Sequence, residues 1–130
     1  MNETTMKVQW SRKPEPHDYP AAVAFLTLLT DQAEADALIA ALATQPIVLH
    51  KAKDLLRAAR LPLLPSDDPY VAADLKKVRK GIKLSPVLLV RGTLHGVPLH
   101  IADGYHRVCA SYHVGEDTDV SAQIVSIDAR

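Results

Sequence analysis

The stretch of this 130-residue chain best suited to chemistry is Asp-Gly-Tyr-His-Arg at positions 103–107. Gly104 permits a sharp turn and lets a ligand approach the backbone closely. An apolar segment precedes the motif and a helical pattern follows it, so the amides after Gly104 start a helix and lack partners within it. Such amides and the positive end of the helix dipole favour an anion. The motif therefore predicts an anion-binding turn, with phosphate as the expected anion.

The side chains of the motif suggest a role for each residue around that anion. Arg107 presents a fork of donors that suits phosphate, and we expect it to be the main side chain that holds the anion. His106 can donate, accept or transfer a proton near neutral pH. Asp103 can accept a proton or help to hold magnesium. We therefore predict Asp103 and His106 as catalytic residues, and Gly104, Tyr105, His106 and Arg107 as ligand-binding residues.

Each residue of the motif also has a purely structural interpretation. Gly104 can serve the turn alone, because only its conformational freedom is needed there. Asp103 can act as a helix cap, and His106 can cap the helix or lie in the core. Arg107 can form an ion pair with a nearby carboxylate such as Asp103. His100, His106 and His113 match no strong metal-ligand spacing, so we do not expect these three histidines to chelate a metal ion.

The elements that position the motif follow from hydrophobic periodicity and from Pro and Gly punctuation. Strands are expected at 47–49, 86–91, 98–102 and 120–127, with a hairpin loop at 92–97 between the second and the third. Helices are expected at 51–60, at 69–80 and at 105–114. The helix at 69–80 has a strong start, an Asp cap followed by Pro69. Its predicted buried face consists of Val71, Leu75, Val78 and Ile82.

The N-terminal third of the sequence predicts a polar arm followed by helices. Residues 1–18 are polar and are expected to form a flexible arm, with Val8 and Trp10 as its possible anchors. A helix is predicted from Pro20, and the capping-box pattern at 31–34 predicts a second helix to about residue 43. One continuous helix is the alternative. The expected organisation is an arm (1–18), a helical extension (19–45) and an α+β domain (46–130) with a mixed sheet of about four strands.

The apolar strand at 84–90, the hairpin and the motif Ile-Ala-Asp-Gly-Tyr-His-Arg-Val-Cys-Ala at 101–110 together resemble the ParB/sulfiredoxin-like superfamily. The resemblance covers roughly residues 47–127. In that superfamily the turn after the hairpin binds nucleotide phosphates: ParB proteins bind CTP, and sulfiredoxins use ATP. Related serine kinases carry a similar Asp-Gly-His-His-Arg turn. The resemblance thus implies phosphate binding by Gly104, His106 and Arg107, with Asp103 matching the kinase-like form.

This chain also departs from the family patterns. Tyr105 stands where sulfiredoxin has its reactive Cys, which argues against sulfinic acid reduction. Cys109 cannot replace it, because Cys109 shares a helical face with Val108 and Tyr112 and is expected to lie buried and unreactive in the core. The sequence after the expected sheet has no helix-turn-helix of the ParB kind, which argues against DNA clamping.

The net charge and the length of the apolar runs limit which functions we expect. Fifteen basic and fifteen acidic residues give a formal net charge of zero, which argues against nucleic-acid binding through a basic surface. The longest apolar run is too short to cross a membrane, so we expect a soluble cytoplasmic protein. The first hypothesis is a nucleotide-binding domain that uses ATP or CTP with magnesium, as a phosphotransferase or nucleotide hydrolase. The alternatives are a non-catalytic binding or regulatory module that keeps the anion pocket, and a ParB-like nuclease.

Overall fold

The computed structural model describes residues 6–127, which contain five helices and four strands. In chain order these are α1 Asp18–Leu26, α2 Gln32–Leu42, β1 Val48–Lys51, α3 Ala52–Ala59, α4 Pro69–Arg79, β2 Val87–Val90, β3 His100–Asp103, α5 Tyr105–Val114 and β4 Asp119–Val125. The strands form one sheet in the order β1-β4-β2-β3. β2 runs parallel to β4, and the two outer pairs are antiparallel. The predicted α+β class with a mixed four-stranded sheet is therefore confirmed.

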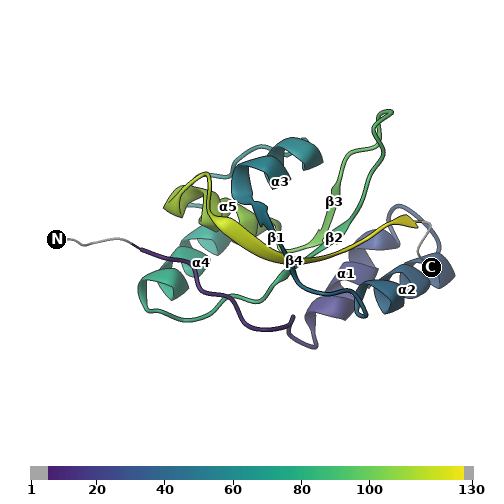
Figure 1. The fold of residues 1–130 in the computed structure, drawn as a ribbon, viewed down its shortest axis with the longest axis horizontal. Coiled ribbons are helices and arrows are strands. Elements are labelled where there is room, and N and C mark those ends of the chain that lie inside the picture. Colours follow the sequence, from purple (N-terminus) through teal and green to yellow (C-terminus); the bar gives the residue numbers. More distant parts are fainter. Residues whose placement is uncertain (1–5, 128–130) are drawn as a thin grey trace.

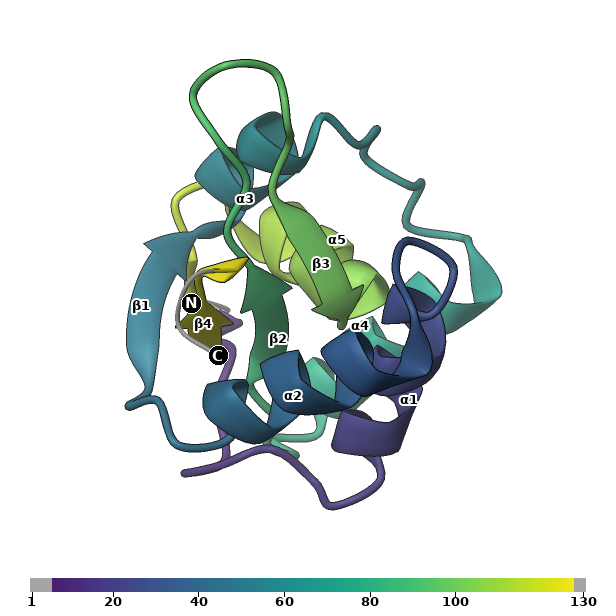
Figure 2. The ribbon, with the colours of Figure 1, turned by 90° about the vertical axis from the view of Figure 1, so that its right-hand side faces the viewer.

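The sheet lies between two layers of helices (Figures 1 and 2). β2 is buried on both faces, and its side chains alternate between the layers. Val87 and Leu89 join the core formed with α3, α4 and α5. Leu88 and Val90 join the core formed with α1 and α2. This three-layer packing explains why the sequence of β2 is continuously apolar, which is the pattern that predicted a strand covered on both faces.

Local capping explains where the N-terminal helices begin and end. The Asp31 carboxylate accepts a hydrogen bond from the Glu34 amide at 2.8 Å, as the capping-box pattern predicts, and α1 and α2 are separate helices. The alternative of one continuous helix is wrong. α1 begins at Asp18 rather than at Pro20, because the first turn of a helix tolerates a proline whose missing amide needs no partner there.

Helix α4 has the predicted start but a shorter buried face. The Asp68 carboxylate accepts hydrogen bonds from the amides of Tyr70 and Val71, and Pro69 occupies the first turn. The helix ends at Arg79, and Gly81 then adopts a left-handed conformation with φ of +72°. This change of direction turns Ile82 outward, and its side chain is 48% exposed. The prediction that Ile82 belongs to the buried face is wrong for this reason.

Residues 6–17 of the expected arm lie against the body of the protein. Trp10 forms a parallel bridge with Leu84, the Ser11 amide donates to the Leu84 carbonyl at 2.8 Å, and the indole Nε1 donates to the Asp119 carbonyl at 3.0 Å. Val8 is buried. The segment passes α4 and leads into α1 (Figure 1). Residues 1–5 of the expected arm lie outside the described residues. Within 6–127, no helix has the length and apolar character needed to cross a membrane.

Candidate functional site

The predicted turn lies at the junction of β3 and α5, as the sequence indicates. β3 ends at Asp103, Gly104 has φ of +112°, and α5 begins at Tyr105. A Cβ atom on Gly104 would lie 2.5 Å from Val87 Cγ1, so both the backbone angle and the space require glycine. No side chain of residues 6–127 caps α5, and its first helical hydrogen bond runs from the Val108 amide to the Gly104 carbonyl. The amides of the first turn are therefore available to a ligand.

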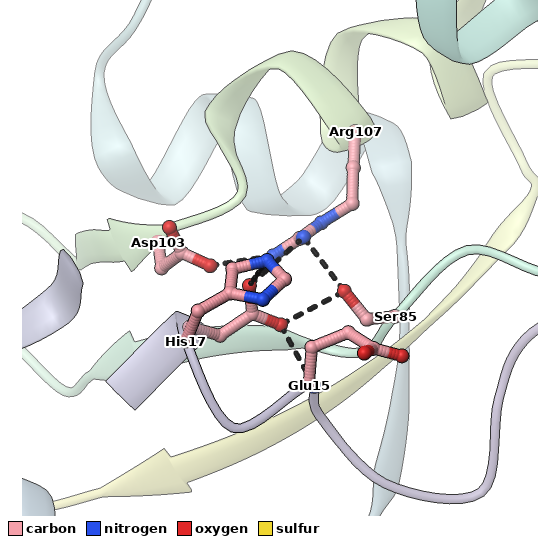
Figure 3. Close-up of polar contacts among 6 residues, drawn as sticks. Glu15, His17, Ser85, Asp103 and Arg107 are labelled. Carbon is pink, nitrogen blue, oxygen red and sulfur yellow. Dashed lines mark hydrogen bonds and ion pairs between the residues drawn. The ribbon is translucent and has the colours of Figure 1, made fainter. Parts of the chain in front are cut away.

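Arg107 is held in a network of polar side chains (Figure 3). Its Nη2 donates to Asp103 Oδ2 at 2.8 Å, and its Nη1 donates to Ser85 Oγ at 2.7 Å. Nη1 also lies 3.7 Å from Asp18 Oδ1, close enough for an ion pair. The side chain of Arg107 is only 15% exposed. The structural interpretation in which Arg107 pairs with Asp103 is thus observed, and the pairing occupies most of the guanidinium.

Asp18 is the member of this network that the sequence analysis missed. Its side chain is 4% exposed, and its Oδ2 accepts hydrogen bonds from Ser85 Oγ at 2.9 Å and from the Glu15 amide at 3.0 Å. His17 Nε2 lies 3.4 Å from Oδ1 of the same carboxylate. Ser85 therefore bridges the two charged groups, since it donates to Asp18 and accepts from Arg107. No local pattern links α1 to α5, because these contacts exist only after the sheet has formed.

Two carboxylates share one guanidinium in this network, which leaves it short of positive charge. Burial raises the pKa of Asp103, and the neighbouring Asp18 adds to the increase, whereas Arg107 opposes both effects. Arg107 Nε is buried and, within the described residues, has no hydrogen-bond partner. The charge of Arg107 is therefore offset within the network, and positive charge in front of it has to come from other groups.

A polar cavity of about 490 Å³ opens in front of this network. It is lined by the turn residues Asp103, Gly104, His106 and Arg107, by Tyr70, Ala73, Asp74 and Lys77 of α4, by Lys83, Leu84 and Ser85, and by Glu15 and His17. The two lysines are candidates for direct contact with an anion. The sequence analysis identified none of Lys77, Lys83 and Asp74 as site residues.

Asp74 faces the same cavity and has a perturbed acidity. Burial raises its pKa, while Lys77, Arg107 and His106 act in the opposite direction. A partly buried carboxyl that shares a cavity with a histidine is the kind of arrangement that active sites use for proton transfer. The helical spacing of the sequence could have placed Asp74 beside the buried face of α4, because it directly precedes Leu75. The charge of its neighbours could not be read from that spacing.

His106 lies between aromatic neighbours at the edge of the cavity. The centroid of its ring is 5.0 Å from that of Tyr70 and 5.7 Å from that of Tyr105. The Tyr105 hydroxyl donates a hydrogen bond to the Pro62 carbonyl, which ties the turn to the connector after α3. His106 is outside the Arg107 network, and it lines the cavity.

Two further sequence expectations can be compared with the structure. Cys109 is fully buried, as predicted, and burial raises the pKa of its thiol. Its low reactivity remains a prediction. Within residues 6–127, no group of three or more His, Cys, Asp or Glu side chains is arranged to hold a metal ion. These donors therefore do not fit a preformed magnesium site.

Comparison with protein-family models, with curated proteins and with solved structures finds no match for this chain. The resemblance to the ParB/sulfiredoxin-like superfamily consequently remains a prediction from the sequence motif.

Proposed function

We propose that the cavity in front of α5 binds the phosphate group of a small molecule, and that a nucleotide is one candidate for that molecule. One observation carries the proposal: the uncapped start of α5 lines the same cavity as Lys77 and Lys83. Helix amides and lysine ammonium groups are the donors that proteins commonly use for phosphate. His106 and His17 add donors whose charge depends on pH.

The network around Arg107 changes the role that the sequence suggested for this residue. Its Nη atoms already donate to Asp103 and Ser85, and two carboxylates offset its charge, so Arg107 mainly fixes the position of Asp103. Direct contacts with phosphate then fall to the α5 amides, His106 and the two lysines. Magnesium has no preformed protein site within the described residues, and the proposal does not depend on it.

A phosphotransferase or nucleotide hydrolase is the enzymatic form of this proposal. The carboxyls of Asp74 and Asp103 face the cavity together with His106, and burial raises the pKa of both carboxyls. A carboxylate or imidazole in this position can accept the proton of an attacking hydroxyl or water. The second candidate is a non-catalytic binding module, which the engagement of Asp103 by Arg107 favours. A cytoplasmic location belongs to the same proposal.

Calorimetric titration of the full chain tests the binding step. The ligands are inorganic phosphate, ATP, CTP and GTP, each with and without magnesium. We expect Lys77→Ala and Lys83→Ala to weaken binding about threefold to fivefold each, because a partly exposed charge contact contributes up to about 1 kcal/mol. Lys76→Ala is the matched control, since Lys76 is an exposed neighbour on α4 that does not line the cavity. Absence of binding by all of these ligands would overturn the proposal.

Release or transfer of phosphate, measured with the ligands that bind, separates the two candidates. Turnover that Asp74→Asn or Asp103→Asn abolishes without loss of binding supports the enzyme. Binding without turnover supports the non-catalytic module.

A further inference from the structure

A second cavity of about 490 Å³ lies beside β3 and has a different character from the first. Its lining is mainly apolar and consists of Phe25 from α1, Ala59 and Leu61 at the end of α3, and the continuous segment 98–106. Phe25 and Leu61 are each 37% exposed, so large apolar side chains face solvent at this cavity. β3 is the last strand in the sheet order, and among the described residues its outer edge has no strand partner.

The two cavities meet at the functional turn. Asp103, Gly104 and His106 line both of them. Charged groups gather on one side of these residues, and apolar side chains gather on the other. His106 presents an aromatic ring at the boundary, and Tyr105 and Phe25 add two more rings on the apolar side.

We propose that the two cavities form one bipartite site, and that its ligand is a phosphate ester whose organic part is a flat, largely apolar ring. This inference rests on the proposed phosphate site. The phosphate occupies the cavity with Lys77 and Lys83, and the ring occupies the cavity with Phe25 and Leu61. Aromatic walls favour a planar group, since rings stack on rings and on imidazole. Cavities of roughly 300–1,000 Å³ are typical of small-molecule sites.

Phe25 gives the N-terminal helix a part in choosing the ligand. α1 packs on the sheet through Ala22 and Leu26, which are buried, whereas Phe25 points away from that core and remains partly exposed. A partly exposed phenylalanine beside a cavity loses water contact when a ring covers it, and this removal of apolar surface from water strengthens binding. α1 therefore contributes to the apolar half of the site.

Calorimetric titration of the full chain with inorganic phosphate, methyl phosphate, phenyl phosphate and a set of nucleoside monophosphates tests the inference. We expect phenyl phosphate to bind about tenfold tighter than methyl phosphate, because the ring buries apolar surface. Phe25→Ala and Leu61→Ala should each reduce this ratio severalfold and leave the affinity for inorganic phosphate unchanged. Leu28→Ala is the control, since Leu28 is 82% exposed and does not line either cavity.

The outcomes separate the two proposals. Equal affinity for methyl and phenyl phosphate overturns the bipartite site and leaves the phosphate site standing. Failure of every phosphate to bind overturns the phosphate site and the bipartite site together. Phenyl phosphate binding that neither apolar variant changes also overturns the bipartite site. Nucleoside monophosphates that bind tighter than phenyl phosphate support a nucleobase as the ring, whereas tighter phenyl phosphate binding supports a simpler aromatic group.

Discussion

Of the two carboxylates that pair with Arg107, Asp103 could be predicted from the sequence and Asp18 could not. Asp103 lies one helical turn before it, so the sequence spacing alone allows their ion pair, and the structure shows this pair. Asp18 belongs to a helix that the sequence analysis placed in a separate extension, and its approach to Arg107 depends on how that helix packs on the sheet. Tertiary structure therefore decides which partners the N–H groups of Arg107 contact. A prediction from residue type alone overestimates how many of these N–H groups are free to bind a ligand.

Arg107→Ala should destabilise the folded protein by about 3 kcal/mol. The change leaves the buried Asp18 and the partly buried Asp103 without their shared cation, and breaking a largely buried ion pair from one side has this order of cost. Urea unfolding followed by circular dichroism measures the effect. Arg57→Ala is the control, because Arg57 is 84% exposed in its pair with Asp54 and should contribute less than about 1 kcal/mol. Equal effects of the two variants would show that the network is not structural and would free Arg107 for the ligand.

The raised pKa of Asp74 predicts a dependence of stability on pH. The folded protein holds the Asp74 proton more tightly than the unfolded chain, whose carboxyl titrates near the ordinary value of 3.8. This contribution to stability is therefore fully present below pH 3.8 and is lost as the pH rises through the folded pKa. Asp74→Asn removes that loss, so the variant should match or exceed the natural protein in stability at neutral pH.

Urea unfolding of Asp74→Asn and of the natural protein at several pH values from 3.5 to 7 checks this prediction. The difference between the two proteins should grow in favour of the variant as the pH rises through the raised pKa. Asp67→Asn replaces an exposed carboxyl in the loop before α4 and serves as the control. A variant that becomes less stable than the natural protein at neutral pH would show that ionised Asp74 stabilises the fold through Lys77.

At the scale of elements, local signals located the helices better than the ends of the strands. The Asp68 cap and the turn at Gly115 are encoded within a few residues, and α4 begins and α5 ends where the sequence predicts. β1 was expected at 47–49 but runs to Lys51, because Lys51 pairs with Asp119 of β4. β3 was expected at 98–102 but spans His100–Asp103, and its end is set by the pairing of Asp103 with Leu88. Strand ends depend on a distant partner, which local periodicity does not contain.

The junction of β3 and α5 should tolerate less change than another glycine turn with a similar backbone. Gly104 and Gly96 both have positive φ, of +112° and +116°. An added Cβ at Gly96 meets nothing within 4 Å, whereas at Gly104 it meets Val87 Cγ1 at 2.5 Å. Gly96→Ala should therefore cost only the backbone strain, about 1–2 kcal/mol. Gly104→Ala should cost about 1–3 kcal/mol more, because it also forces atoms into a packed core.

Urea unfolding of the two glycine variants tests this difference. Similar costs at the two positions would mean that Val87 moves aside easily, and the tight packing behind the turn at Gly104 would lose its support.

For the whole molecule, the sequence predicted the sheet and its mixed direction but not how the N-terminal third attaches to it. The apolar stripe of α1 indicates that one face is buried, yet it does not say against what. In the structure α1 and α2 cover one face of the sheet, and their core includes Leu42 together with Leu88 and Val125. Trp10 lies with the core on the opposite side of the sheet. Both helical layers and the segment before α1 thus contact the same strands.

This packing predicts that the chain unfolds as one cooperative unit. Leu42→Ala removes a fully buried side chain, which should cost about 2–5 kcal/mol. Trp10 is the single tryptophan of the chain, so its fluorescence reports the N-terminal segment on the other side of the sheet. In a two-state transition every probe shifts together. Leu42→Ala should therefore lower the urea midpoint of Trp10 fluorescence and of circular dichroism by the same amount.

The control for this test is Leu94→Ala at the hairpin tip, where the side chain is 99% exposed and both midpoints should stay in place. A fluorescence midpoint that stays in place while the circular dichroism midpoint falls would contradict the single unit. It would instead support the flexible arm expected from the composition of residues 1–18. In that case the contacts of Trp10 with Leu84 and Asp119 would contribute little to stability, because the segment would detach before the helices unfold.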